Sequence, residues 1–296
     1  MVIISYNSAS TILETVASLV DPPPPFPLEV IVVDNSSSDE TVNLVRKNFP
    51  AVRLILNEHN LGFARANNIG ANEAEGRFLL FLNPDAKITS KELSLMLSRM
   101  EKDDGIGGIG PAIFSPDGRY ELSYGFKPSF LNELYQKLLS FLLSRRNILS
   151  RFLARKRLGR EREVPWLTAA CLLLRREAFE RVAGFDERFF LYFEDVDLSL
   201  RIREAGFSLI YFPEAIVIHR RGGSTSLFPL SVAKEYRRSQ LYFYGKHYGK
   251  GRLILLKVYL IVKFFFGLLF SLLRLTGKEP FFYIEMIKFV LRYRSG

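Results

Sequence analysis

The chain reveals its architecture at Val30-Ile31-Val32-Val33-Asp34-Asn35-Ser36, an apolar run that ends abruptly in polar residues. A second run, Phe78-Leu79-Leu80-Phe81-Leu82-Asn83-Pro84-Asp85, repeats the pattern. Strands that are apolar on both faces are typical of a parallel sheet covered by helices on both sides. Ligands of such sheets bind at the carboxyl ends of the strands, so the two polar tips mark the expected site.

The first third of the chain alternates short β-branched runs with helical patterns. We expect four strands, at Val2 to Ser5, Leu28 to Val33, Val52 to Leu56 and Phe78 to Leu82. Strands that are separated by crossover helices pair in parallel. The sequence therefore predicts an α/β fold with a mostly parallel sheet and flanking helices. From about Gly105 the pattern becomes irregular and rich in glycine.

Composition limits the class of protein. The 296 residues, 48% of them apolar, can fill the core of one large α/β domain or of two smaller ones. A net charge of +10 favours an anionic partner: nucleic acid, a phosphorylated substrate or a lipid headgroup. Cys171 is the only cysteine, which excludes an intrachain disulfide and a cysteine zinc site and favours a reducing, cytosolic compartment.

The N-terminus carries no pattern of a signal peptide, because Met1 to Tyr6 already reads as a β-strand. We therefore expect no secretory leader in this chain. Since the first residue falls inside a predicted core strand, we also expect that native residues precede it or that the start is misassigned.

A basic amphipathic stretch runs from Leu134 to Leu158, where Leu and Phe recur at helical spacing among lysines and arginines. One interpretation is a solvated helix that covers the core. The other is a contact with a membrane surface or with a lipid diphosphate.

A second apolar stretch, Leu253 to Leu273, is about as long as a bilayer span but contains Lys257 and Lys263. A lysine at the centre of a spanning helix costs about 2.5 to 3.5 kcal/mol. We favour a helix that lies in the membrane interface over one that spans the bilayer. A buried helix or an oligomer contact is the third alternative.

A carboxylate, Asp34, stands at the first polar tip. At a sheet edge it can accept hydrogen bonds from a base N–H or a ribose hydroxyl, although it could also be a simple turn residue. We expect Asp39, in the same loop, to serve mainly as a helix N-cap.

Asn60 to Gly70 places a tight turn before a helix with small residues and amides, which suits contact with a nucleotide. The absence of a Gly-x-Gly-x-x-Gly motif and of a phosphate-loop lysine argues against a dinucleotide dehydrogenase and a phosphate-loop NTPase.

Asp85 follows the second apolar run, so a divalent cation could bridge it to a diphosphate at the sheet edge. Oxygen ligands and phosphate suit Mg²⁺ or Mn²⁺, and the alternative is an ordinary Pro-Asp turn.

Farther along, Glu194-Asp195-Val196-Asp197 follows an aromatic run. We predict Asp195 as a general base whose pKa is raised by partial burial, and Asp197 as a residue that caps the helix and pairs with Arg201.

His219 ends the apolar run from Ala215 to Ile218 and precedes a basic, Gly-rich segment that extends from Arg220 to Thr225. A neutral imidazole at this point could bind the metal, and the segment after it could hold phosphate oxygens. The alternative is a purely structural histidine.

Taken in order, these stretches resemble family-two glycosyltransferases of the GT-A fold, especially the branch of bacterial rhamnosyltransferases. The resemblance covers Met1 to Ser226. It is carried by Ile4-Ser5-Tyr6-Asn7, Val33-Asp34-Asn35-Ser36, Asn60 to Gly70, Asn83-Pro84-Asp85, Trp166 to Cys171, Gly184-Phe185-Asp186-Glu187 with Glu194-Asp195-Val196-Asp197, and His219.

The resemblance implies a GT-A Rossmann-like sheet followed by a C-terminal apolar helical segment. Residues 1–110 would form the nucleotide-sugar-binding half, 111–230 the acceptor-binding and catalytic half, and 231–296 a membrane-associating helical region. The implied donor-binding residues are Ser5, Tyr6, Asn7, Asp34, Asn67, Asn83 and Asp85. The implied metal ligands are Asp85 and His219, the catalytic base is Asp195, and the acceptor-binding residues are Trp166 and Glu194. The family motif often carries an aspartate where this chain has Asn83.

The reaction implied by the resemblance is a direct displacement that inverts the anomeric configuration and uses Mg²⁺ or Mn²⁺. The implied donor is dTDP-rhamnose, with UDP-sugars as the alternative. The implied acceptor is a lipid-linked saccharide in envelope polysaccharide synthesis, at the cytoplasmic face of the inner membrane.

Two other classes of protein, one enzymatic and one noncatalytic, are alternatives to a glycosyltransferase. A sugar nucleotidyltransferase would carry a basic, Gly-rich loop after its first strand, where this chain has Ser5-Tyr6-Asn7-Ser8. A noncatalytic nucleotide-sugar or lipid-binding protein of the same fold would not need Asp85, Asp195 and His219 together. Nucleic acid is not the expected partner, because the basic residues cluster with Leu and Phe and form no polar stripe.

Overall fold

The computed structural model describes residues 1–129, 132, 135, 138, 158–220, 229–273 and 279–294. Its contacts divide the chain into two compact units. The first, Met1–Arg188 with Asp195–Ser224, is called the α/β unit; the second, Phe189–Glu194 with Thr225–Gly296, is called the helical unit. Most of the basic stretch predicted at 134–158, and the Gly-rich segment after Arg220, lie outside the described residues.

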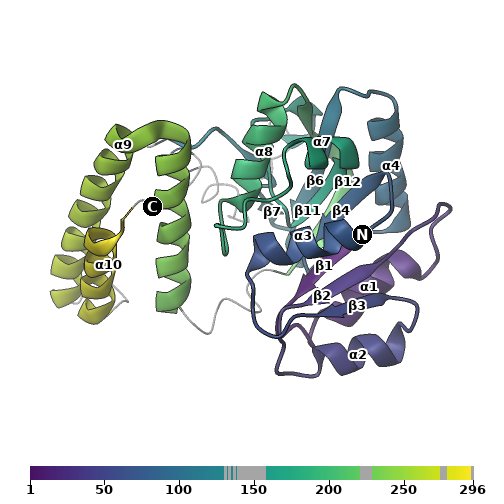
Figure 1. Cartoon of the computed structure of the whole chain (residues 1–296), viewed down its shortest axis with the longest axis horizontal. Coiled ribbons are helices and arrows are strands. Elements are labelled where there is room, and N and C mark those ends of the chain that lie inside the picture. The colour runs from purple at the N-terminus through teal and green to yellow at the C-terminus, as the bar shows by residue number, and fades with distance from the viewer. Residues whose placement is uncertain are drawn as a thin grey trace. The chain divides into compact units, whose positions relative to one another are not determined.

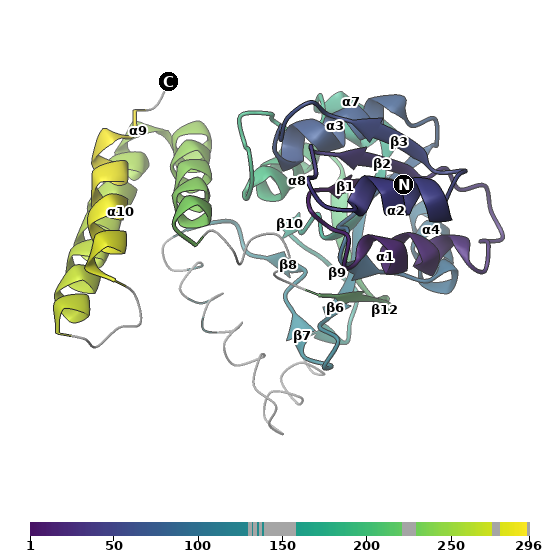
Figure 2. The ribbon, with the colours of Figure 1, turned by 90° about the horizontal axis from the view of Figure 1, so that it is seen from below.

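Four parallel strands form the first part of the sheet in the order β3-β2-β1-β4 (Figure 1). Their bounds are β1 Val2–Ser5, β2 Ile31–Asp34, β3 Arg53–Leu56 and β4 Phe78–Leu82. The predicted strands and their parallel pairing are therefore confirmed. Helices α1 (Ile12–Val20) and α4 (Ser90–Glu101) cover one face of the sheet, and α3 (Phe63–Glu73) covers the other (Figure 2). Helix α2 (Thr41–Asn48) contacts α1.

The second part of the sheet is mixed. Strand β11 (Cys171–Arg175) lies antiparallel between β4 and β6 (Ile106–Phe114), and β12 (Ser208–His219) runs parallel to β6. Short strands extend it or pair beside it: β5 Ala86–Lys87, β7 Tyr120–Glu121, β8 Tyr124–Gly125, β9 Arg162–Glu163 and β10 Trp166–Leu167. Two helices complete the unit, α7 Arg176–Arg181 and α8 Glu194–Glu204.

The irregular, Gly-rich pattern after Gly105 did not predict a strand, yet β6 is a buried strand of nine residues. Its glycines are required by close packing rather than by turns. A Cβ atom would lie 2.7 Å from Phe207 Cβ at Gly107 and 2.6 Å from Leu174 Cδ2 at Gly108. Glycine inside a strand often marks such a close approach, although in the sequence alone a run rich in glycine resembles a loop.

The helical unit contains α9 (Pro229–Leu272) and α10 (Pro280–Arg292). A left-handed Gly249, with φ 77°, breaks α9 into two helices. Helix α10 packs on α9 at Gly267, where a Cβ atom would overlap the Tyr283 ring. Lys234 Nζ also donates to Glu285 Oε2 over 2.9 Å.

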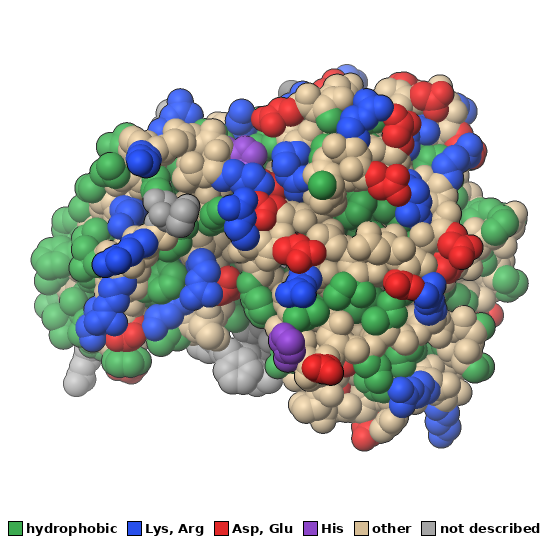
Figure 3. Space-filling model, in the orientation of Figure 1, with side chains coloured by type: hydrophobic (Ala, Val, Ile, Leu, Met, Phe, Trp, Pro, Cys, Tyr) green, Lys and Arg blue, Asp and Glu red, His purple; other side chains and the backbone are tan. Residues whose placement is uncertain are grey.

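Much of the helical unit's surface is apolar, as the green side chains over it in Figure 3 show. The exposed apolar side chains on α9 include Ile254, Leu255, Val258, Phe265, Phe266, Phe270 and Leu272. Among the described residues, one helix, Leu230–Leu272, is long and apolar enough to cross a membrane, and 22% of its most apolar window is buried. Such low burial argues against the buried-helix alternative.

A hydrogen-bonded turn after α7 is fixed to α3 by Asn68. Asn68 Oδ1 accepts from Phe185 N over 2.9 Å, while Nδ2 donates to Phe185 O over 2.9 Å and to Glu187 Oε1 over 3.1 Å. The preceding Gly184 has φ 69°, and a Cβ there would lie 2.7 Å from Asn68 Oδ1. This turn therefore needs both the glycine and the asparagine.

We expect Asn68→Ala to lower the free energy of unfolding of the α/β unit by about 1 to 3 kcal/mol, because polar groups of the turn lose their partners. Urea denaturation measures the change. Asn72→Ala is the matched control, since Asn72 is exposed on the same helix and alanine favours helix. Equal effects of the two substitutions would contradict the role of Asn68.

Candidate active site

Three polar strand ends meet at one edge of the sheet. Strand β1 lies between β2 and β4, and Ser5 pairs in register with Asp34. Asn83 and Asp85 follow β4 directly. Because the three strands are parallel, their carboxyl ends lie side by side, as the sequence predicted.

The Asp34 carboxylate organises the loop after β2. It is buried and accepts three hydrogen bonds, from Ser5 Oγ over 2.8 Å, Ser37 N over 2.8 Å and Ser37 Oγ over 2.5 Å. A carboxylate has about four acceptor positions, so roughly one is left for a ligand. Asp34 thus orients this loop and keeps limited capacity for a base or ribose.

Tyr6 and Asn7 form the outer rim of this edge. Asn7 adopts the left-handed conformation with φ 49°, and its Oδ1 accepts from Ser38 N over 2.8 Å. Tyr6 is 36% exposed. The bond between Asn7 and Ser38 thus joins the loop after β1 to the loop after β2, and Tyr6 lies exposed in the first of these loops.

Of the neighbouring amides, Asn67 lies within α3. It is buried, and its Nδ2 donates to Phe63 O of its own helix over 2.9 Å, so this amide is engaged inside the helix. The sequence did not single out Asn35, which joins the end of β2 to the start of α3. Asn35 Nδ2 donates to Gly62 O over 3.1 Å, and Asn35 Oδ1 accepts from Asn57 Nδ2 over 2.8 Å.

His219 lies beside two carboxylates. Strand β12 pairs with β5 there, which places His219 Nε2 3.1 Å from Asp85 Oδ1 and 3.4 Å from Asn83 Nδ2. On the other side of the ring, Nδ1 is 3.2 Å from Glu121 Oε2. Burial lowers the pKa of His219, but hydrogen bonds and charge from Asp85 and Glu121 outweigh it and raise the pKa to about 9.

Asp85 and His219 are the candidate ligands of a divalent cation. No group of three or more His, Cys, Asp or Glu side chains with metal-binding geometry occurs among the described residues. Two such ligands are nevertheless enough for Mg²⁺-type sites, which complete their shell with water and substrate phosphates. Adjacent ligand atoms of an octahedral ion lie roughly 3 Å apart, close to the 3.1 Å between Asp85 Oδ1 and His219 Nε2. The pair fits a metal.

Glu121 fits the same arrangement as the group that orients the imidazole through Nδ1. A histidine that binds a metal usually donates its other N–H to such a partner. Sequence reasoning missed Glu121, because it belongs to a two-residue strand in the irregular part of the chain and carries no motif.

Asp195 occupies the first turn of α8 and is partly exposed. Its Oδ1 accepts from Val196 N over 2.8 Å, and its Oδ2 from Ala169 N over 3.4 Å. Burial raises the pKa of Asp195, and hydrogen bonds from these two amides and from the Thr168 hydroxyl oppose the rise. A carboxylate of this kind can accept a proton from a hydroxyl group.

A short segment, Thr168–Ala170, joins Asp195 to the edge of the sheet. Ala169 N donates to Asp195, and Ala170 O accepts from Asn83 N over 3.0 Å. Two residues before it, Trp166 is half-buried and donates from Nε1 to Phe126 O over 2.9 Å. The candidate base and the candidate metal ligands are thus parts of one hydrogen-bonded structure.

The two acidic neighbours of Asp195 have different surroundings. Asp197 is fully buried, and its Oδ2 accepts from Arg201 Nε over 2.8 Å, which confirms the predicted pairing. Glu194 is also buried and stands at the start of α8. Before it, Tyr192 and Phe193 adopt left-handed conformations, with φ 71° and 66°.

Comparison with known proteins agrees with this architecture. The family model described as "Glycosyl transferase family 2" matches residues 1–183. The chain is 31% identical over 235 residues to the N-acetylglucosaminyl-diphospho-decaprenol L-rhamnosyltransferase of Mycobacterium tuberculosis, covering 75% of this chain and 76% of the relative. It is 28% identical over 166 residues to the rhamnosyltransferase WbbL of Escherichia coli, covering 53% and 60%.

Solved structures show the same fold. The S. aureus TarS 1-349 structure gives a TM-score of 0.53 at 15% identity and covers 98% of this chain and 69% of that one. The mannosyltransferase PcManGT from Pyrobaculum calidifontis, in complex with GDP-Man and Mn2+, gives 0.55 at 18% identity and covers 84% and 64%. The chain belongs to glycosyltransferase family 2, with the GT-A fold, and within that family to the rhamnosyltransferase-like branch.

Proposed function

We propose that the chain transfers a sugar with inversion of configuration and that Asp195 is the base. Asp195 would take the proton of an acceptor hydroxyl while that oxygen bonds to the anomeric carbon. The bond from this carbon to the nucleoside diphosphate breaks on the opposite face, and the diphosphate leaves with the electron pair. The observation that carries this proposal is the Thr168–Ala170 segment, which bonds to Asp195 and to the strand end that precedes Asp85.

Asp85 and His219 would hold a divalent cation, which would neutralise charge on the departing diphosphate. The donor set of one carboxylate oxygen and one imidazole nitrogen favours Mn²⁺ over Mg²⁺, because Mg²⁺ prefers oxygen ligands. Two structural neighbours, GalNAc-T7 and PcManGT, were solved with Mn²⁺. Asn83, whose Nδ2 lies beside His219, would help to order the pair.

The nucleoside would bind at Ser5, Tyr6, Asn7 and Asp34, next to Asn67 on α3. We propose dTDP-rhamnose as the donor, with UDP-sugars as the alternative, since two relatives are rhamnosyltransferases. The acceptor would be a lipid-linked saccharide bound near Trp166 and Glu194, because the mycobacterial relative is described as acting on a diphospho-decaprenol saccharide. Its product would enter envelope polysaccharide.

The helical unit would hold the enzyme at the cytoplasmic face of the cell membrane. This part of the proposal is supported by the exposed apolar side chains on α9 and on α10, where Phe281 is 64% exposed. Lys257 and Lys263 stand on the same helix. Such a combination suits a helix that rests in the interface, where lysines can reach the lipid headgroups.

The proposal predicts a metal-dependent nucleotide shift in melting temperature. In a panel of dTDP, UDP, GDP and CDP, each with and without Mn²⁺, we expect one nucleotide to stabilise the protein only when Mn²⁺ is present. His219→Ala should abolish that dependence, while His247→Ala, in the helical unit, should preserve it. A panel without any shift would overturn the transferase site.

Asp195→Asn should keep nucleotide affinity and reduce turnover by at least about a hundredfold, the scale for loss of a general base. Release of nucleoside diphosphate from the donor in the presence of acceptor measures the rate. The matched control is Asp104→Asn, at a carboxylate whose side chain is 95% exposed. An unchanged rate in Asp195→Asn would remove that residue from the role of base.

Membrane binding should depend on the exposed face of α9. Replacing Phe265 and Phe266 with Ser should sharply reduce the fraction of protein that floats with anionic vesicles, because less apolar surface enters the lipid. Ile216→Ser, at an exposed apolar side chain of the α/β unit, should leave flotation unchanged. Failure of the unmodified protein to float would refute membrane association.

A further inference from the structure

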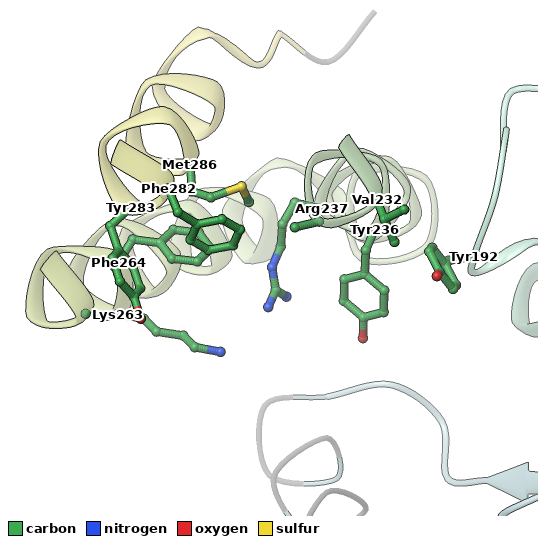
Figure 4. Close-up of a pocket in the computed structure, with 11 residues that line it drawn as sticks. Tyr192, Val232, Tyr236, Arg237, Lys263, Phe264, Phe282, Tyr283 and Met286 are labelled. Carbon is green, nitrogen blue, oxygen red and sulfur yellow. The ribbon is translucent and has the colours of Figure 1, made fainter. Parts of the chain in front are cut away.

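The helical unit contains a pocket of about 530 Å³ that is lined by α9, α10 and Tyr192 (Figure 4). Five of its eleven described lining residues are aromatic, and the charged ones among the eleven are Arg237 and Lys263. These come from the two halves of α9, on either side of Gly249. A pocket whose described lining contains two cations and no carboxylate is complementary to an anion.

Arg237 is held in place but not neutralised. Its guanidinium lies 4.9 Å from the centre of the Tyr236 ring and 5.8 Å from that of Phe264, and Nη1 donates to Gln240. The nearby Lys234 and Arg238 each pair with a glutamate, whereas no ion pair involves Arg237 within the part of the chain that the structure describes. A guanidinium ordered in this way retains donors for a phosphate group.

The pocket continues into the exposed apolar face. Phe265 and Phe266 directly follow the lining residue Phe264, and both are about half exposed, at 50% and 52%. Phe281, at 64%, precedes the lining residue Phe282. An occupant with an anionic head and a long apolar tail would match both surfaces, whereas a free phosphate would use only the pocket.

Tyr192, one of the residues that line the pocket, is close in sequence to the candidate base. Tyr192 is three residues before Asp195, and an extended chain spans at most about 3.6 Å per residue. Their Cα atoms therefore lie within about 11 Å of each other. This distance is on the scale of one or two sugar units.

We propose that this pocket binds the diphosphate of the polyprenyl-linked acceptor, with Arg237 and Lys263 as its ligands. The assignment rests on the proposed function, in which a lipid-linked saccharide is the acceptor. The diphosphate would lie between the two cations, and the prenyl chain would follow the apolar side chains of α9 into the membrane.

The test measures binding of the full chain to neutral phosphatidylcholine vesicles that contain either a polyprenyl diphosphate or phosphatidylglycerol at equal total charge. We expect the unmodified protein to bind the diphosphate vesicles about tenfold more tightly or better, the scale of one charge-assisted hydrogen bond. The double substitution R237Q/K263Q should remove the preference and leave binding to phosphatidylglycerol. Lys257→Gln, on the same helix but outside the pocket lining, is the control and should keep the preference.

Three results would overturn the assignment. The unmodified protein could bind both vesicles equally, which indicates general attraction to anionic lipid; the double variant could keep the preference; or Lys257→Gln could lose it. If the double variant does not fold, Lys263→Gln alone is compared with Lys257→Gln. The nucleotide shift in melting temperature is measured in parallel. Loss of that shift together with an intact lipid preference would refute the transferase proposal and leave the lipid site standing.

Discussion

The parallel pairing of β1 between β2 and β4 is the constraint on which the rest of the site depends. It brings Ser5, Asp34 and the Asn83–Asp85 turn to one edge, although they are far apart in sequence. With an antiparallel β2, Asp34 would lie at the opposite edge. The Asp34 carboxylate then fixes the loops above this edge through Ser5 and Ser37. Backbone hydrogen bonds thus determine where the polar groups stand before any ligand arrives.

The antiparallel strand β11 adds the second half of the site. Cys171 pairs with Leu82, so the segment just before β11 emerges beside the end of β4. From there Ala170 bonds to Asn83 and Ala169 bonds to Asp195. An additional parallel strand in this position would present its carboxyl end instead, and its preceding loop would lie at the other edge. The mixed sheet therefore allows one short segment, Thr168–Ala170, to form hydrogen bonds with both Asn83 and Asp195.

Sequence patterns found the features that local chemistry encodes and missed those that depend on distant contacts. Strands β1 to β4 were predictable because buried parallel strands are continuous apolar runs, and the Asp197–Arg201 pair because both lie on one helix. Strand β6 was missed because its glycines leave room for Phe207 and Leu174, which only the fold brings near. Glu121 was missed because only the fold brings it to His219. Asn67 and its neighbour Asn68 differ only in the helix face on which each lies, which no local pattern reveals.

The turn before Asp195 is strained, and it belongs to the helical unit. Tyr192 and Phe193 hold left-handed conformations, which cost about 1 to 3 kcal/mol for each non-glycine residue. Such strain persists only where packing enforces it. Here the Tyr192 and Phe193 rings lie 5.4 Å from Tyr236 and 5.3 Å from Phe243, and Ser239 Oγ donates to Leu191 O over 2.8 Å. These contacts belong to the helical unit, whereas Asp195 belongs to the α/β unit. The turn that precedes Asp195 in the chain is therefore held in its strained conformation by packing inside the helical unit.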